Sequence, residues 1–270
     1  MTETAYLREA RRLEQTPAFD AAVLGMAADL RAYYRDNAIA ARIFADVGQL
    51  AIVSCLIAAP EPVTEAALCR IVGAGALASR QRVRRHIGKL EHLGLIATLP
   101  ANDARVRPLT PTPALEHQLN QWVRALAGQA RHLFALDSAL LDDPHLARTY
   151  LAQVMQSHQL GFSAFEATPS IARIVTLSRG HALVLEWLAA HIETNTRDIA
   201  FSRRAFGAAY GVSRTHVIDL IKECADIGLL APDANLQLTP AFVTQARLWA
   251  AINFVLAAAT LERRLIPALA

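Results

Sequence analysis

The segments SRQRVRRHIGKLEHLGLIA (residues 79–97) and SRTHVIDLIKECADIGLLA (residues 213–231) are two copies of one pattern. Each begins with a serine suited to cap a helix, places apolar residues at helical spacing, and ends with a glycine suited to a left-handed helix terminus. The identities at a constant offset of 134 are Ser79/Ser213, Arg80/Arg214, Val83/Val217, Ile87/Ile221, Gly94/Gly228, Leu95/Leu229 and Ala97/Ala231. The pattern predicts one capped, half-buried helix that occurs twice.

The match continues outward from these segments. Upstream, residues 41–43 (ARI) match residues 172–174 at an offset of 131, and downstream, residues 109–111 (LTP) match residues 238–240 at an offset of 129. A tryptophan follows in each half, Trp122 and Trp249. These offsets are about half of the 270-residue length, so the sequence indicates an internal duplication of the whole chain.

Both halves predict the same order of elements. In the first half we expect helices over 19–35 and 43–56, a helix over 65–72 capped by Thr64, a turn at 73–75, the helix after Ser79, a hairpin over 95–99 and 106–109, and a closing helix over 113–136. In the second half we expect a core helix over 183–191, a helix over 203–210 capped by Ser202, the helix after Ser213, a shorter hairpin over 229–238, and a closing helix over 239–265. Helix, helix, turn, helix, hairpin is a winged helix-turn-helix.

The expected fold is therefore mainly α with short β-hairpins. It consists of two winged helix-turn-helix domains in tandem, related by a pseudo-twofold axis and packed through their terminal helices. Residues 1–136 hold an N-terminal helical arm and repeat 1, and residues 137–270 hold linking helices and repeat 2.

The first copy of the repeated helix is rich in positive charge. Of the 27 basic residues in the chain, 25 are arginine, and no acid occurs between Glu65 and Glu91. A helix-turn-helix places the N-terminal residues of its second helix against base edges in the major groove. There Gln81 can read adenine, and arginines can read guanine or contact phosphate. The candidate DNA-binding residues of this copy are Ser79, Arg80, Gln81, Arg82, Arg84, Arg85, Lys89 and, in the hairpin, Arg105 and Arg107.

The second copy is less basic. Residues 213–226 carry a net charge of −1, while Arg203 and Arg204 add a basic edge at the preceding helix. Its candidate DNA-binding residues are Arg203, Arg204, Ser213, Arg214, Thr215 and His216. Two interpretations remain open for this copy: it reads a different half-site, or it has diverged toward a partner-binding or structural role.

Residues 79–115 resemble the recognition helix and wing of the MarR-type winged-helix transcription regulators. The resemblance lies in Gly-Leu-Ile at 94–96, Asp-Ala-Arg at 103–105 and Leu-Thr at 109–110, with Ala104 where that family has arginine and Ala114-Leu115 in place of its final glycine. It implies that Asp103 and Arg105 brace the wing and that Arg105 reaches the minor groove. It also implies an intramolecular pseudo-dimer joined by the closing helices, and a small-molecule effector between the terminal helices and the winged domain. The chain could also form a homodimer.

Motifs for other chemistry are weak or missing. Residues 73–78 fit GxGxxA, but a helix is expected before them, where a dinucleotide-binding fingerprint needs a strand. Cys55, Cys69 and Cys224 have no metal-site spacing, and His86 and His92 are expected at the surface. We therefore expect no enzyme activity, no cofactor and no metal site.

The residues also bear on location and on the competing functions. The N-terminus has no signal-peptide pattern, and the apolar run 248–261 is shorter than a membrane span, so a cytoplasmic protein without membrane contact is expected. Double-stranded DNA is the expected partner of a transcriptional regulator. The alternatives are a protein-interaction scaffold of the chromosome-partition type and a replication-initiator-like DNA binder.

Overall fold

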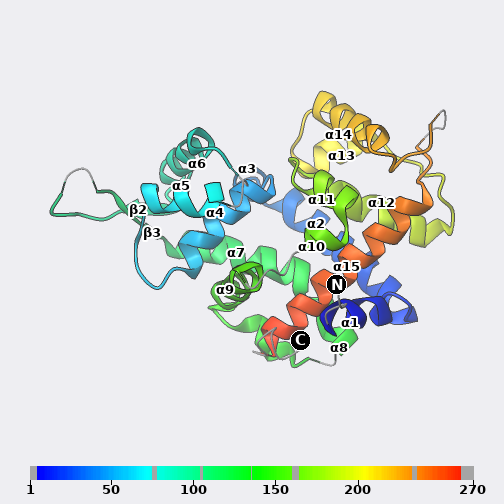
Figure 1. Cartoon of the computed structure of the whole chain (residues 1–270), viewed down its shortest axis with the longest axis horizontal. Coiled ribbons are helices and arrows are strands. Elements are labelled where there is room, and N and C mark those ends of the chain that lie inside the picture. Colours follow the sequence, from blue (N-terminus) through cyan, green and yellow to red (C-terminus); the bar gives the residue numbers. More distant parts are fainter. Residues whose placement is uncertain are drawn as a thin grey trace.

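Helices dominate the computed structural model, which describes residues 5–74, 78–103, 106–134, 136–159, 164–232 and 236–262 (Figure 1). The first half contains α1 (Ala5–Leu13), α2 (Pro17–Asp36), α3 (Ala40–Ile43), α4 (Val47–Ala58), α5 (Glu65–Ala74), α6 (Arg80–His92), α7 (Pro113–Ala127) and α8 (Ala130–Phe134). The second half contains the 3-10 helix η1 (Ser138–Asp142), α9 (Leu146–Gln159), α10 (Ala164–Ala167), α11 (Pro169–Val175), α12 (Gly180–Thr194), α13 (Arg203–Tyr210), α14 (Arg214–Asp226) and α15 (Pro240–Leu261).

The repeated segments form α6 and α14 with matching ends. The Ser79 hydroxyl accepts a hydrogen bond from the amide of Arg82 at 3.3 Å, and the Ser213 hydroxyl accepts one from the amide of His216 at 3.2 Å. Both helices are followed by a glycine with positive φ, +66° at Gly94 and +74° at Gly228. Because only glycine adopts this conformation without strain, the shared sequence pattern sets the same helix termination in both halves. The predicted serine caps and exit glycines of both helices are confirmed.

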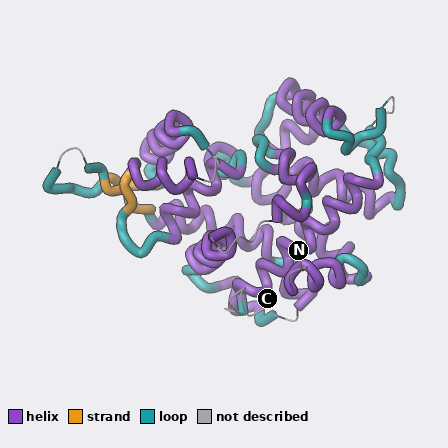
Figure 2. The backbone as a smooth tube through the Cα atoms, in the orientation of Figure 1, coloured by secondary structure: helices purple, strands orange, loops and turns teal. Residues whose placement is uncertain are grey.

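The strands form one small antiparallel sheet in the first half. β1 (Val63–Thr64), β3 (Pro108–Pro111) and β2 (Ile96–Thr98) lie in that order, with Leu109 opposite both Val63 and Thr98. The sequence predicted the hairpin but not β1. In the described part of the second half, the corresponding positions form only isolated bridges, so the strands in Figure 2 gather at one end of the molecule. The fold is therefore mainly α with a small antiparallel sheet.

Two expected long helices are each divided. The helix expected over 43–56 is split because Asp46 caps α4, accepting a hydrogen bond from the amide of Gln49 at 3.0 Å. The helix expected over 113–136 is split into α7 and α8 at Gly128–Gln129. Two further boundaries differ as well: α5 continues through Gly73, where a turn was expected, and α15 ends at Leu261.

The hydrogen bonds also revise the register of the repeat. Thr112 is the N-cap residue of α7, and its hydroxyl donates to the carbonyl of Leu95. Thr239 is the N-cap residue of α15, and its hydroxyl donates to the carbonyl of Leu229. Thr112 is thus the counterpart of Thr239, in place of Thr110 as the LTP match suggested. The buried Trp122 and Trp249 show the same offset of 127.

An N-terminal helix of each half packs against the other half. α2 of the first half packs along α12 of the second, and α9 of the second half packs along α4 of the first. Each of these N-terminal helices also contacts the closing helix of its own half, α2 with α7 and α9 with α15. One continuous hydrophobic core results, in which Phe19 and Phe254 meet edge to face with ring centroids 6.0 Å apart.

α15 is the only described helix that is long and apolar enough to cross a membrane, and 67% of its most apolar window is buried inside the protein. Because a core helix is equally apolar, this burial accounts for its composition without a bilayer. The expected burial of residues 248–261 is confirmed.

Candidate nucleic-acid interface

The outward face of α6 is defined by the residues that point inward. Val83, Ile87 and Leu90 are buried at helical spacing and fix the orientation of the helix. The opposite face exposes the polar side chains of its first two turns, Arg80, Gln81, Arg82, Arg84 and Arg85. His86 departs from the prediction: it is 4% exposed because it lies on the apolar stripe, and burial lowers its pKa to about 4. The prediction that His86 is a surface residue is wrong.

Carboxylates from neighbouring helices reach this face. Arg84 Nε donates to Glu65 Oε1 of α5 at 2.6 Å, and Arg82 Nη2 lies 2.5 Å from Oδ2 of Asp46, the buried cap of α4. A stretch of sequence without acids therefore folds against acids on other elements. Both arginines remain accessible, with side-chain exposures of 63% for Arg84 and 44% for Arg82.

Three side chains of the face remain unpaired within the described part of the chain. Arg80, Gln81 and Arg85 are exposed, and none of them forms a hydrogen bond or an ion pair there. Lys89 is different, because its ammonium donates to the carbonyl of Arg42 at 2.7 Å and its pKa is lowered, first by burial. The first turns of α6 thus offer two free guanidinium groups and one free amide.

The hairpin extends from one end of the molecule (Figure 1). Arg107 donates to Glu91 Oε1 at 2.6 Å, which ties the hairpin to the last turn of α6. Asp103 is exposed near the tip, whereas Arg105 lies outside the described residues. The bracing contact at the base of the hairpin is therefore made by Arg107.

α14 presents a different surface in the second half. Arg214 and Thr215 are exposed in its first turn, but His216 lies against the protein, with Nε2 donating to the carbonyl of Ser178 at 2.7 Å. At the position that corresponds to Arg84, Ile218 is 40% exposed and Asp219 follows it. Among the predicted residues on this helix, Arg214 and Thr215 are the ones that face solvent.

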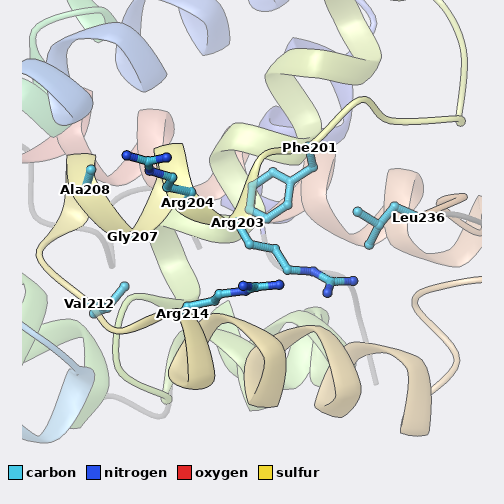
Figure 3. Close-up of a pocket in the computed structure, with 8 residues that line it drawn as sticks. All are labelled: Phe201, Arg203, Arg204, Gly207, Ala208, Val212, Arg214 and Leu236. Carbon is cyan, nitrogen blue, oxygen red and sulfur yellow. The ribbon is translucent and has the colours of Figure 1, made fainter.

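Arg203, Arg204 and Arg214 are among the residues that line an open pocket. Its volume is about 610 Å³, and it lies between the first turns of α13 and α14. Apolar side chains complete the lining, including Phe201, Val212 and Leu236. Figure 3 shows Arg203 and Arg214 running next to each other in the space between the two helices, whereas Arg204 extends in the opposite direction.

A buried arginine links the two halves behind these surfaces. Arg179 is 0% exposed; its backbone amide donates to the carbonyl of Ala45, and its guanidinium donates to the carbonyls of Phe44 at 2.8 Å and Tyr210 at 2.9 Å. The guanidinium also lies 4.4 Å from the ring centroid of Tyr34. Burial lowers the pKa of Arg179. One side chain therefore holds the end of α13 to the loop that precedes α4.

Sequence reasoning missed Asp46, Glu65 and Arg179. The cap pattern before residues 47–50 was a usable signal for Asp46. Glu65 was identified only as a helix-start acid, since its partner Arg84 is 19 residues away. Nothing local marks Arg179, because its partners come from both halves.

The described residues contain no group of three or more His, Cys, Asp or Glu side chains placed to hold a metal ion. The thiols of Cys55 and Cys224 are buried, which raises their pKa to about 11 and about 12. These two cysteines are therefore packing residues rather than reactive thiolates.

Comparison of the chain with protein-family models, curated proteins and solved structures gives no match.

Proposed function

We propose that this chain is a transcriptional regulator that binds double-stranded DNA through two winged helices joined as an intramolecular pseudo-dimer. The observation that carries the proposal is the placement of α6 and α14. Both helices lie along the same side of the molecule in Figure 1, and each exposes an arginine in its first turn. Two such helices on one side fit a ligand with a repeating groove, as in dimeric helix-turn-helix proteins.

In this proposal the first copy makes the principal contact. Arg80 and Gln81 are at the N-terminus of α6, where a recognition helix meets base edges, and Arg85 is placed to contact phosphate. Arg84 can exchange the carboxylate of Glu65 for a phosphate, because its side chain is 63% exposed and ion pairs of exposed arginines are weak. The hairpin, with Arg107 and Arg105, is directed to the neighbouring minor groove, as the resemblance to MarR-type regulators implies.

The second copy contributes a smaller contact through Arg214 and Thr215. The unpaired Arg203 and Arg204 extend it toward the phosphate backbone. Since the second copy lacks the arginines that correspond to Arg84 and Arg85, its half-site differs from that of the first.

Fluorescence anisotropy with a labelled generic duplex at 50 and 200 mM salt tests the proposal. Affinity falls as salt rises, and the Arg80→Ala/Arg85→Ala variant reduces the slope of log K against log salt by about 1.8, or about 0.9 for each phosphate contact. The control is Arg131→Ala on α8, at the opposite side of the molecule in Figure 1, which leaves the slope unchanged. Absence of binding at 50 mM salt would refute the proposal.

A protein-interaction scaffold is the second candidate, favoured by the outer face of α14. There the exposed Ile218 replaces an arginine, and Asp219 and Lys222 beside it nearly cancel in charge. A mixed surface of this kind suits a protein partner better than phosphate. If Ile218→Glu leaves DNA affinity unchanged and abolishes capture of a protein partner identified by cross-linking, the second copy belongs to this class.

A further inference from the structure

The pocket between α13 and α14 concentrates positive charge. Among the described residues that line it, none is acidic. Arg203, Arg204 and Arg214 form no hydrogen bond or ion pair within the described part of the chain. Arginine does not lose its charge at physiological pH, so the pocket carries three permanent charges.

The position of these arginines in their helices adds to this excess. Arg203 and Arg204 are the first two residues of α13, and Arg214 is the first residue of α14. The N-terminus of a helix already carries partial positive charge, where carboxylates are favoured and cations are not. No acid occupies the first turn of either helix. A bound anion would therefore relieve repulsion and also accept hydrogen bonds.

In the first half, the position that corresponds to Arg203 is occupied by an acidic residue that neutralises an arginine. Glu65 is the first residue of α5 after the capping Thr64, as Arg203 is the first residue of α13 after the capping Ser202. Glu65 neutralises Arg84, whereas the counterpart of Arg84 is Ile218. The second half has thus replaced an internal ion pair by an uncompensated arginine. Within the described residues, the unpaired charge of Arg203 is therefore specific to the second half, whereas Arg214 shares its unpaired state with its counterpart Arg80.

The remaining lining identifies the kind of anion. Phe201 lies beside Arg203, and Leu236 lies at the end toward which Arg203 and Arg214 extend (Figure 3). An aromatic ring next to guanidinium groups can stack on a planar base, and arginine binds phosphate in a bidentate manner. The volume of about 610 Å³ is within the range of small-molecule sites.

We propose that this pocket binds a nucleoside polyphosphate, with the phosphates on Arg203 and Arg214, Arg204 at the opposite rim, and the base against Phe201. Direct binding is measured without DNA, so the inference does not depend on the proposed DNA contact. The two functions share Arg203, Arg204 and Arg214, where a bound nucleotide would compete with DNA phosphates.

Calorimetric titration of the full chain with ATP at 50 mM salt tests this site. ATP binds with one site per chain, and Arg203→Glu and Arg214→Glu each weaken the binding by tenfold or more. Arg131→Glu makes the same charge change on α8 and leaves the affinity within twofold of wild type. No ATP binding at millimolar concentration, or equal binding by the Arg203→Glu/Arg214→Glu variant, would overturn the proposal.

Tripolyphosphate, which has no base, tests whether the base of ATP contributes to binding. Tripolyphosphate binds the wild-type chain at least fivefold more weakly than ATP if Phe201 contacts the base. Equal affinity of the wild-type chain for ATP and tripolyphosphate would overturn the assignment of the ligand as a nucleotide. Phe201→Ala is predicted to abolish the difference between the two ligands, with circular dichroism as a check that the variant folds, because Phe201 packs on Trp187.

Discussion

Replacing Glu65 by glutamine is predicted to strengthen DNA binding, although Glu65 has no role in contacting DNA. Glu65 Oε1 accepts from Arg84 Nε at 2.6 Å in the free protein, so a phosphate must compete with this carboxylate. Glu65→Gln keeps the shape and removes the charge. One further guanidinium then becomes available, and the slope of log K against log salt steepens by about 0.9.

The affinity change follows from the same relation. Between 200 and 50 mM salt, one additional phosphate contact increases the gain in affinity by about 3.5-fold. The Arg84 side chain is 63% exposed and that of Glu65 is 25% exposed, so loss of this surface ion pair has little effect on folding stability. The variant therefore remains folded, and any change in binding reports on Arg84.

The assay is anisotropy of one labelled duplex across a salt series, with thermal unfolding as a check of the fold. The matched control is Glu65→Gln/Arg84→Ala, which lacks the released arginine and returns to the wild-type slope. An unchanged or shallower slope for Glu65→Gln would refute the assignment of this face of α6 to phosphate.

Three further predictions concern stability, each measured by urea unfolding. Arg179→Ala lowers the free energy of unfolding by about 3 kcal/mol, because buried carbonyls from both halves lose their donor; a change below 1 kcal/mol would contradict this role. Burial lowers the pKa of His86 to about 4 and that of His181 to about 3, so the unfolded chain takes up these protons first. Stability is then highest above about pH 7 and falls by about 2 to 3 kcal/mol between pH 7 and 5.5, and a flat profile would show that these histidines do not titrate as inferred. Gly180→Ala places a Cβ 1.7 Å from the carbonyl oxygen of Ile174 and costs roughly 3 kcal/mol or more, whereas Gly94→Ala meets nothing within 4 Å and costs only the strain of φ +66°, about 1 kcal/mol; equal losses for the two would contradict the steric argument.

Local signals explain which parts of the fold could be predicted. Serine caps and exit glycines act through their own neighbours, so α6, α13 and α14 were predicted to within a residue at their N-termini. The burial of His86 was also readable, since it is three residues after Val83 and four before Leu90 on the apolar stripe. β1 has only two residues and no alternation to detect.

The rest depends on contacts between distant segments. The number of free charges on α6 could not be counted from its own sequence, because Asp46 and Glu65 come from α4 and α5. The exchange of α2 and α9 between the halves has no signal within either copy, since an apolar face does not specify its partner. The unpaired charge of the pocket could not be recognised from the sequence alone. It follows from comparing Arg203 with Glu65, and the two positions are equivalent because each follows the capping residue of its helix.

The interlocking of α2 with α12 and of α9 with α4 also separates this architecture from an ordinary pair of identical subunits. Because the two halves are one polypeptide and each completes the other, dilution cannot dissociate them. A substitution in one half is not copied into the other. Selection can therefore alter the exposed residues of α14 while those of α6 stay unchanged.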